Sequence, residues 1–239
     1  MNISILATKL FIPNTRSGLV RRPRLIEKLN EGLQRKLNLV SAPAGFGKTT
    51  LVSEWVDNLQ MSASKEDLIV NRIAWLSLDD GDNDPKRFLT YFITALSRIE
   101  GIETTIGEGA LNILHSNQLP LIRDALTSLI NELIAIPDRI ILVLDDYHVI
   151  ESPLVDSALN FLIENLPLQM HLVITTREDP NLILTRLRAR GQMTEIRADE
   201  LRFTIDETAA FLDEMMSFNL SGEDVAALEA RTEGWIAGL

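Results

Sequence analysis

The stretch Ala42-Pro43-Ala44-Gly45-Phe46-Gly47-Lys48-Thr49 decides the fold of this chain. It fits the phosphate-loop pattern, in which a glycine-rich loop ends in Gly-Lys-Thr or Gly-Lys-Ser, except that alanine stands where the first glycine is usual. Gly45 and Gly47 permit backbone angles that other residues avoid, so consecutive N–H groups can line one concavity and cradle a β-phosphate. The Lys48 ammonium then reaches phosphate oxygens, and the Thr49 hydroxyl suits Mg²⁺. The sequence therefore predicts a site for a nucleoside triphosphate with Mg²⁺, and ATP is the expected nucleotide.

The residues on either side of the loop supply the strand and the helix that the motif requires. Residues 37–42 are a short apolar run typical of a buried strand. After the loop, Leu51, Trp55 and Leu59 recur every four residues, which predicts a helix that begins at Lys48. Because the positive end of that helix also favours a bound phosphate, a glycine-rich turn without function is the weaker alternative. The predicted nucleotide contacts of the loop are Ala44, Gly45, Phe46, Gly47, Lys48, Thr49 and Thr50.

A second motif is a pair of carboxylates after an aliphatic run. Residues 140–144 are five consecutive aliphatics, the pattern of a strand buried on both faces of a parallel sheet, and Asp145 and Asp146 follow them. Ligands of open α/β sheets bind at the carboxyl edge of the strands. Asp145 is therefore predicted to hold Mg²⁺ through water, and Asp146 to orient or deprotonate the attacking water. A solvated turn is the alternative, which the phosphate loop disfavours.

Residues 172–174 form a shorter aliphatic run of the same kind, and Thr175, Thr176 and Arg177 follow it. If this strand lies next to the one that precedes Asp145, the three side chains emerge beside that carboxylate. Arg177 is then placed to sense a γ-phosphate, and one of the two threonines to hold the lytic water. The alternative for Arg177 is a surface charge at a strand end.

Helical patterns fill much of the remaining chain. Their apolar positions include Leu25, Leu29 and Leu33 in a helix that ends near Gly32, and Ile122, Leu126, Leu129 and Leu133 in one that Pro137 stops. Asp84 with Pro85 has the form of an N-cap and first-turn proline, Thr204 with Glu207 has capping-box spacing, and Ser221 to Asp224 opens a last helix. Residues 99–120 show no clear period. Strands separated by helices predict βαβ units, with a helical tail in a different layer.

Composition excludes several classes of protein. The chain has 239 residues, 46% of them hydrophobic and 24% charged, and no run approaches the roughly 20 apolar residues of a membrane span. Cysteine is absent and no signal segment begins the chain, so the cytoplasm is the expected compartment. The net charge of −11 disfavours duplex binding, although residues 1–50 carry nine Lys/Arg and two Asp/Glu. The end at Leu239, directly after Gly-Trp-Ile-Ala-Gly, predicts a piece of a longer protein.

Other titratable groups suggest no separate site. The acidic residues between 79 and 84 lack the glycine and distal glutamate of a calcium loop, so helix capping and solvation are the better account. His115, His148 and His171 show no metal-ligand spacing and are interpreted as structural. No serine lies in a nucleophile-elbow pattern.

The motifs resemble the signal-transduction ATPases with numerous domains (STAND), specifically the N-terminal nucleotide-binding domain of MalT-like, LuxR-type transcriptional activators. The likeness extends over essentially the whole chain. The residues that carry it are Thr8-Lys9-Leu10 with Pro13, Leu19-Val20-Arg21-Arg22-Pro23-Arg24-Leu25, Ser41-Ala42-Pro43-Ala44-Gly45, Trp75-Leu76-Ser77-Leu78-Asp79, Leu144-Asp145-Asp146-Tyr147-His148 and Thr232-Glu233-Gly234-Trp235.

The resemblance implies an α/β fold: a P-loop NTPase of three layers with a mainly parallel sheet of the ASCE type, followed by the start of a small helical domain. It divides the chain into an N-terminal adenine-side segment and helix (1–35), the NTPase core (36–200) and the start of a helical lid domain (201–239). Val20, Arg21 and Arg22 are the implied adenine contacts, through the Val20 backbone and stacking by an arginine.

The implied function is a switch. ADP holds a closed monomer, an inducer bound elsewhere opens it, and ATP supports self-association that lets a C-terminal helix-turn-helix bind promoters. The sensor and DNA-binding modules are not in this sequence, so DNA contact is expected only through that absent part, and no membrane partner is expected. Asp146 stands where many vigorous ATPases place glutamate, and its shorter reach predicts slow turnover, below roughly 10 s⁻¹.

Three alternatives remain open. A small-molecule kinase would need an acceptor pocket with a base beyond Asp146, and the sequence reveals none. A scaffold that retains nucleotide without hydrolysing it would release phosphate no faster than its Asp146→Asn variant. Direct DNA binding by this domain, disfavoured by the charge of −11, would appear as a gel shift at physiological salt.

Replacing Lys48 with alanine is expected to abolish binding of ADP and ATP, because the loop loses the ammonium that pairs with phosphate oxygens. Calorimetric titration of the purified variant with each nucleotide measures the effect. Near-normal affinity for either one would contradict the assignment of the phosphate loop.

Overall fold

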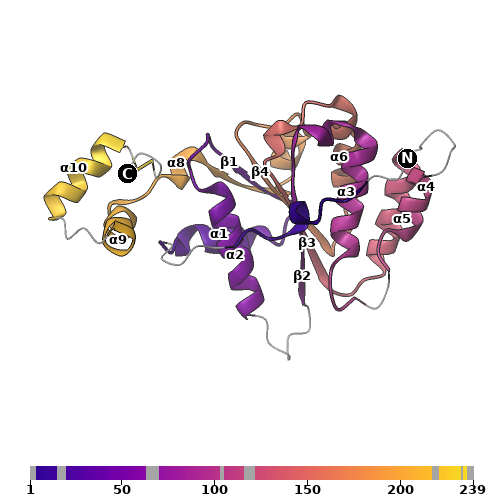
Figure 1. Ribbon diagram of the computed structural model, residues 1–239, viewed down its shortest axis with the longest axis horizontal. Coiled ribbons are helices and arrows are strands. Elements are labelled where there is room, and N and C mark those ends of the chain that lie inside the picture. Colours follow the sequence, from indigo (N-terminus) through magenta and orange to yellow (C-terminus); the bar gives the residue numbers. More distant parts are fainter. Residues whose placement is uncertain are drawn as a thin grey trace.

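A parallel sheet with helices on both faces forms the body of the molecule (Figure 1). The computed structural model describes residues 4–14, 20–62, 70–102, 105–115, 122–216, 221–232 and 234–235. Within these residues the sheet has five strands in the order β2-β3-β4-β1-β5, and each neighbouring pair is parallel. The strands are β1 (Leu37–Ser41), β2 (Asn71–Ser77), β3 (Arg139–Asp145), β4 (Met170–Thr176) and β5 (Met193–Arg197).

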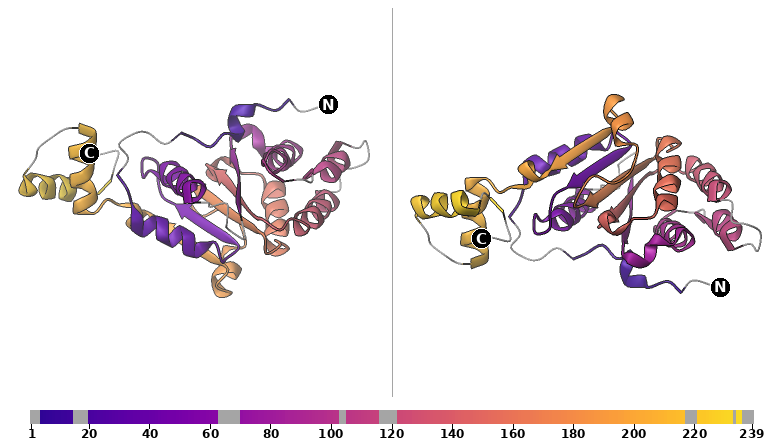
Figure 2. Two further views of the ribbon diagram at one scale, coloured as in Figure 1. Left: turned by 90° about the horizontal axis from the view of Figure 1, so that it is seen from below. Right: turned by 90° about the horizontal axis from the view of Figure 1, so that it is seen from above.

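The helices fall into two layers and a separate tail (Figures 1 and 2). On one face of the sheet lie α1 (Pro23–Gly32) and α2 (Lys48–Ser62). On the other lie α3 (Pro85–Ser97), α4 (Glu108–His115), α5 (Ile122–Ile134) and α6 (Pro153–Glu164). The shorter elements are η1 (Ala7–Leu10), η2 (Asp80–Asn83), η3 (Tyr147–Val149), α7 (Leu184–Ala189) and α8 (Ala198–Leu201). The tail comprises α9 (Ile205–Met216) and α10 (Gly222–Thr232).

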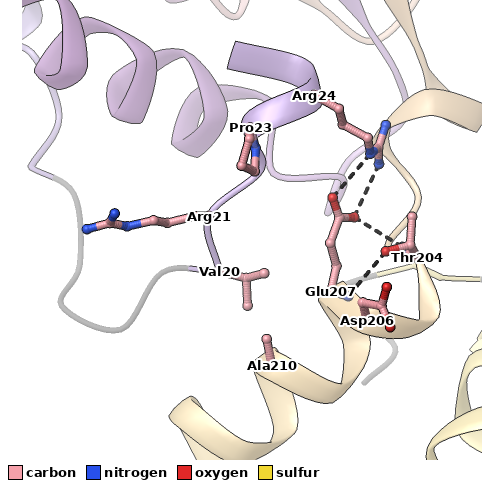
Figure 3. A pocket seen from close by; sticks show the side chains of 8 residues that line it. All are labelled: Val20, Arg21, Pro23, Arg24, Thr204, Asp206, Glu207 and Ala210. Atoms are coloured by element: carbon pink, nitrogen blue, oxygen red, sulfur yellow. Dashed lines mark hydrogen bonds and ion pairs between the residues drawn. The ribbon is translucent and has the colours of Figure 1, made fainter. Parts of the chain in front are cut away.

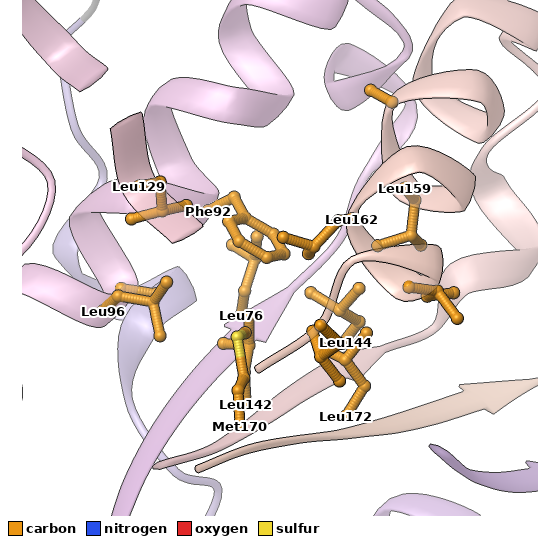
Figure 4. Close-up of a cluster of buried hydrophobic side chains, with 14 of the residues drawn as sticks. Leu76, Phe92, Leu96, Leu129, Leu142, Leu144, Leu159, Leu162, Met170 and Leu172 are labelled. Atoms are coloured by element: carbon orange, nitrogen blue, oxygen red, sulfur yellow. The ribbon is translucent and has the colours of Figure 1, made fainter. Parts of the chain in front are cut away.

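The two cores explain why the strands read as continuous aliphatic runs. Successive strand residues point to opposite faces, and both faces of this sheet are covered. In β3, Leu142 and Leu144 belong to the core under α3, α5 and α6, which Figure 4 shows, whereas Ile141 and Val143 belong to the core under α1 and α2. All four side chains are fully buried. The predicted three-layer α/β arrangement is therefore confirmed.

The predicted helix starts are also confirmed. The Asp84 carboxylate accepts a hydrogen bond from the Arg87 N–H at 2.7 Å, and Pro85 opens α3. Thr204 and Glu207 exchange the two bonds of a capping box at 3.1 and 3.2 Å. The Ser221 hydroxyl accepts from the Asp224 N–H at 3.2 Å at the start of α10.

Sequence patterns do not predict the helices α4, α6 and α7 or the strand β5. The strand β5, Met-Thr-Glu-Ile-Arg, lies at the edge of the sheet and is only partly buried, so its polar residues hide it from an apolar-run criterion. The helix α6 is apolar at most positions. It begins with Pro153, a residue that the first turn of a helix accommodates.

The helical tail lies to one side of the sheet (Figure 1). It is tied to the end of α8 by a hydrogen bond from the Phe203 N–H to the Gly234 carbonyl at 2.8 Å, and Phe203 packs edge-on against Phe211. The proposed boundaries after residues 35 and 200 remain a prediction. Leu19 and Glu233 of the family motifs, and the end at Leu239, lie outside the described residues.

The interpretation of the acidic stretch is correct for the capping of η2 and wrong for the solvation of Asp82. Asp79 caps η2, but Asp82 is completely buried. Its carboxylate pairs with Lys9 and, at 3.3 Å, with Arg87, and Lys9 also lies 4.5 Å from the centre of the Tyr91 ring. The cation comes from η1, which packs beside β2, so local sequence around Asp82 could not reveal it.

His171 has the properties predicted for a structural histidine. His171 is buried in β4, where its Nδ1–H donates to the Arg35 carbonyl at 2.7 Å, and burial lowers its pKa to about 4, as expected of a structural, neutral histidine. Among the described residues no cluster of His, Asp and Glu has the composition of a metal site. None of the described helices combines the length and apolar character needed to cross a membrane.

Replacing Lys9 with methionine is expected to lower the free energy of unfolding by about 3 kcal/mol, because Asp82 would lose a cation inside the protein. The matched control is Lys28→Met: Lys28 pairs with Glu200, and both side chains are over a third exposed (35% and 38%). That exposed pair should contribute less than about 1 kcal/mol. Urea unfolding followed by circular dichroism measures both, and equal losses would contradict a buried ionic anchor at Lys9.

Candidate functional site

The predicted site residues meet at the carboxyl edge of the sheet. The glycine-rich loop joins β1 to α2, Asp145 ends β3, and Thr175 and Thr176 end β4. Because β4 lies between β1 and β3, its terminal threonines lie between the start of the loop and Asp145 along the edge of the sheet. The condition set from the sequence, that β3 and β4 are neighbours, is met.

The loop has the conformation that its glycines were predicted to allow. Gly45 and Gly47 have φ of 81° and 72°, in the left-handed region. Ala42, which replaces the usual first glycine, is not among the described residues of positive φ, and its N–H continues the sheet by donating to the Thr176 carbonyl at 3.2 Å. The departure from the motif therefore removes no conformation that the loop needs.

Lys48 is buried and turned back over its own loop. Its ammonium donates to the carbonyls of Ala42 at 2.8 Å and Pro43 at 3.0 Å. Burial lowers the pKa of Lys48, the charge of Asp146 opposes that shift, and the charge of Arg177 adds to it. The ammonium therefore lies within electrostatic reach of Asp145, Asp146 and Arg177.

Asp145 is the centre of a buried hydrogen-bond network. The Thr49 hydroxyl donates to its two carboxylate oxygens at 3.0 and 3.1 Å, and the Thr175 hydroxyl donates at 2.5 Å. Burial raises the pKa of Asp145, while the hydrogen bond from Thr175 acts in the opposite direction. The predicted pair of magnesium-binding residues, Thr49 and Asp145, is thus in direct contact.

Asp146 has an unusual backbone. Its φ of 60° and ψ of 41° are left-handed, and it is the one non-glycine residue with positive φ in the part of the chain that the structure describes. Its N–H donates to the Thr175 hydroxyl oxygen at 2.9 Å. Such strained conformations persist where surrounding contacts fix them and are common at active sites, so Asp146 has the properties expected of a functional residue.

His148 lies beside Asp146, and Arg177 lies at the same edge of the sheet. The His148 Nδ1 lies 3.7 Å from its carboxylate, and burial lowers the pKa of His148, with the charge of Arg177 adding to that shift. Arg177 is exposed in the bend after β4. Its charge acts on both His148 and Lys48, so it faces the same edge. His148 was not predicted to belong to the site, although it falls inside a motif two residues after Asp146.

The two threonines at the end of β4 have different hydrogen-bond partners. Thr175 bonds Asp145 and Asp146, whereas the Thr176 hydroxyl donates to the Glu178 carbonyl at 2.8 Å. Consecutive residues of a strand point to opposite faces, which explains why only one of them can lie between the two aspartates.

The predicted adenine-side residues lie beside a pocket of about 560 Å³ between the segment before α1 and the helix α9 (Figure 3). Its walls include Val20, Arg21, Pro23 and Arg24 on one side and Glu207 and Ala210 on the other. Figure 3 shows the Arg21 side chain extending away from α9.

Arg22, the third predicted adenine contact, is not among the lining residues. It is buried, donates to the Glu207 carboxylate at 3.1 Å and stacks over Phe203 at 4.9 Å. Arg24 donates to the same carboxylate at 3.2 Å. Burial raises the pKa of Glu207, but the bonds from Arg24, the Thr204 N–H and Arg22 together hold it below its usual range. Glu207 was predicted only as a helix cap, so its role as a bridge was missed.

Comparison with known proteins gives relatives over nearly the whole chain. No family model matches. The chain is 35% identical over 234 residues to the serine/threonine-protein kinase PknK of Mycobacterium tuberculosis, a match that covers 98% of this chain and 20% of the relative. It is 33% identical over 235 residues to the HTH-type transcriptional regulator MalT of Klebsiella pneumoniae, covering 98% and 24%. The chain thus spans about a fifth to a quarter of these relatives.

Solved structures share the fold. A STAND protein with a tetratricopeptide repeat sensor from Pyrococcus horikoshii superposes with a TM-score of 0.57 at 18% identity, over 93% of this chain and 29% of that one. Drosophila ORC bound to DNA gives 0.57 at 14% identity, over 94% and 54%. The chain belongs to the MalT-like STAND P-loop NTPases.

The site of this STAND domain fits the groups that its family implies. Two left-handed glycines precede the N-terminus of α2, the arrangement that a phosphate-binding loop requires, so the domain has the architecture of a nucleotide-binding domain. The hydroxyl of Thr49 and the carboxylate of Asp145 are hard oxygen donors, the kind that Mg²⁺ prefers, and they lie 3.0 Å apart. The chemistry of the residues present therefore suits a nucleotide with Mg²⁺.

Replacing Thr175 with valine keeps the side-chain volume but removes the hydroxyl between Asp145 and Asp146. We expect the affinity for ATP with Mg²⁺ to fall about tenfold, because a hydrogen bond to a charged group contributes about 1.5–3 kcal/mol. The matched control is Thr176→Val, an equally buried neighbour whose hydroxyl bonds only to the Glu178 carbonyl among the contacts described. Calorimetric titration measures both variants, and equal affinities would contradict the network.

Proposed function

We propose that this domain binds ATP and ADP with Mg²⁺ and hydrolyses ATP slowly, as the switch module of a signal-responsive transcriptional regulator. The observation that carries the proposal is the left-handed Asp146, joined through Thr175 to the Thr49–Asp145 pair at the end of the glycine-rich loop. A phosphate cradle, a cation and a fixed carboxylate are the parts that ATP hydrolysis requires.

Phosphate binding is assigned to residues 44–50. The backbone N–H groups around Gly45 and Gly47 and the Lys48 ammonium supply positive charge, and the buried position of Lys48 strengthens its attraction to an anion. Thr49 and Asp145 are the proposed ligands of Mg²⁺, directly or through water. When bound, Mg²⁺ neutralises charge on the phosphate oxygens.

Hydrolysis is assigned to Asp146, with Arg177 on the γ-phosphate side. The Asp146 side chain is 48% exposed, so water can reach it, and its N–H is fixed by Thr175. An aspartate reaches about one methylene less far than a glutamate, and slow turnover is the proposed consequence.

The base is assigned to the pocket beside Val20 and Arg21. One wall comes from the segment before α1 and the other from α9, so a base bound there would contact both the N-terminal segment (1–35) and the proposed lid (201–239). We propose that Arg22 acts on this pocket indirectly, by holding Glu207, which lines it. A site shared between two domains is suited to a switch, because its occupancy alters how they sit together.

The regulatory role extends the comparison with MalT. That relative is named an HTH-type transcriptional regulator, and this chain covers 24% of its length. We propose that self-association in the ATP-bound form, and DNA binding through a helix-turn-helix outside this sequence, belong to the full-length protein. PknK is named a kinase, but the chain covers only 20% of it, so that name assigns no acceptor chemistry to these residues.

Replacing Asp146 with asparagine is expected to lower phosphate release from ATP at least about a hundredfold, because the amide cannot accept a proton from water. Binding of ADP should persist, since the phosphate loop is unchanged. The parent should turn over below roughly 10 s⁻¹, the median for enzymes.

The matched control is Asp124→Asn, an exposed carboxylate on α5 away from the site, which should leave phosphate release unchanged. A continuous phosphate assay compares the three proteins. Equal rates for the parent and Asp146→Asn would contradict hydrolysis at this site and favour a module that only retains nucleotide. Parent turnover well above the median would contradict the slow switch.

A further inference from the structure

The loop that carries Asp146 is braced by a residue that belongs to no known motif of the site. We infer that Asn83, in η2 after β2, is a positioning residue for the hydrolysis proposed above: it fixes residues 146–151 and so the carboxylate of Asp146. The inference rests on the proposed function and adds to it a residue from the acidic stretch that sequence analysis set aside.

The side-chain amide of Asn83 bonds the backbone of the Asp146 loop in both directions. Its Nδ2 donates to the Val149 carbonyl at 2.8 Å, and its Oδ1 accepts from the Glu151 N–H at 2.7 Å. A further bond joins Nδ2 to the Asp80 carbonyl at 3.1 Å. An asparagine amide offers one acceptor and two donors, and all of these are used with the correct polarity. The Asn83 side chain thus forms one donor and one acceptor bond with the loop backbone, as a neighbouring strand would.

The loop needs such a brace because Asp146 is strained. A left-handed conformation of a residue other than glycine persists only where surrounding contacts fix it. The chain leaves Asp146 through η3, in which the Val149 N–H bonds back to the Asp146 carbonyl at 3.2 Å. Displacing Val149 would therefore pull directly on Asp146.

Three contacts fix this turn at its start, middle and end. At the start, the Asp146 N–H bonds Thr175 at 2.9 Å. In the middle, the buried Tyr147 hydroxyl donates to Asp156 of α6 at 2.8 Å. At the end stand the two bonds of Asn83. The first two contacts come from β4 and α6, and Asn83 is the contact from the opposite side, the loop after β2.

Asn83 is itself held firmly. The turn η2 is closed by a capping box. The Asp79 carboxylate accepts hydrogen bonds from the Gly81 and Asp82 N–H groups, and the Asp79 N–H donates to the Asp82 carboxylate at 2.9 Å. The buried Asp82 then pairs with Lys9 and Arg87. Because a buried charge is costly without its partners, these pairings favour one position of the η2 turn. The cluster thereby gives Asn83 a defined position from which to brace the loop.

The contacts of Asn83 predict which kinetic constant depends on it. Its described hydrogen bonds go to Asp80, Val149 and Glu151, and none goes to the phosphate loop or to the lining of the pocket beside Val20. Loss of Asn83 should therefore displace the Asp146 carboxylate while leaving the binding surfaces in place. The expected result is a change in kcat without a matching change in nucleotide affinity.

The test compares Asn83→Ala with the parent chain in ATP hydrolysis and in calorimetric titration with ADP. We expect kcat to fall about tenfold to a hundredfold, the loss typical of a small misplacement of a catalytic group, with KM for ATP and Kd for ADP unchanged. Amide exchange should show reduced protection of the Glu151 N–H. Asn83→Asp is the second variant, because it keeps volume and the acceptor for Glu151 but turns a carboxylate oxygen toward the Val149 carbonyl.

The matched control is Asn160→Ala. Asn160 is also half-buried and also braces loop backbone, accepting from the Ile183 N–H at 2.9 Å, but in a loop that does not carry Asp146. Its kcat should equal that of the parent. An unchanged kcat in both Asn83 variants would overturn the inference, and so would a loss shared with Asn160→Ala or matched by weaker ADP binding. A parent without Asp146-dependent phosphate release would overturn the proposed function and this role with it.

Discussion

The hydroxyl of Thr175 links the parts of the site that the fold brings together. It donates to the buried Asp145 carboxylate and accepts from the Asp146 N–H, so one side chain on β4 fixes both residues at the end of β3. Asp145 in turn accepts from Thr49, the first-turn residue of α2. A buried carboxylate is stable only when hydrogen bonds satisfy it. The network forms only because the parallel register brings the ends of β1, β4 and β3 together, and the network in turn stabilises that register.

An ionic bridge joins the start of α1 to the start of α9. Glu207 at the start of α9 accepts from Arg22 and Arg24, which flank Pro23 at the start of α1. The segment that lines one wall of the adjacent pocket therefore also holds the helix that forms the other wall. Because the two predictions for this region, a cap at Glu207 and base contacts near Arg22, concern one structural unit, a change at either residue will act on both.

Local sequence was sufficient for features whose physics is local. The loop geometry of Gly45 and Gly47 and the caps at Asp84 and Thr204 follow from neighbours a few residues away. The pairings that sequence reasoning missed join distant segments: the Lys9 ammonium reaches Asp82 across 73 positions, and the Arg22 guanidinium reaches Glu207 across 185. Nothing in the pattern around a carboxylate states which cation it will meet. Such pairs are decided by the tertiary fold, as is the polar edge strand β5.

The charges of the site explain why nucleotide and metal should act together. Burial disfavours the charged form of Lys48 and also that of Asp145, since it lowers the pKa of the first and raises that of the second. An anion alone would stabilise the Lys48 ammonium but oppose ionised Asp145, and a cation alone would have the reverse effect. A ligand that brings phosphate to Lys48 and a divalent cation to Asp145 stabilises both charged forms at once. Within the protein, the Lys48 ammonium donates to the Ala42 and Pro43 carbonyls and Asp145 accepts from Thr49, so both charged groups lie where such a ligand would meet them together.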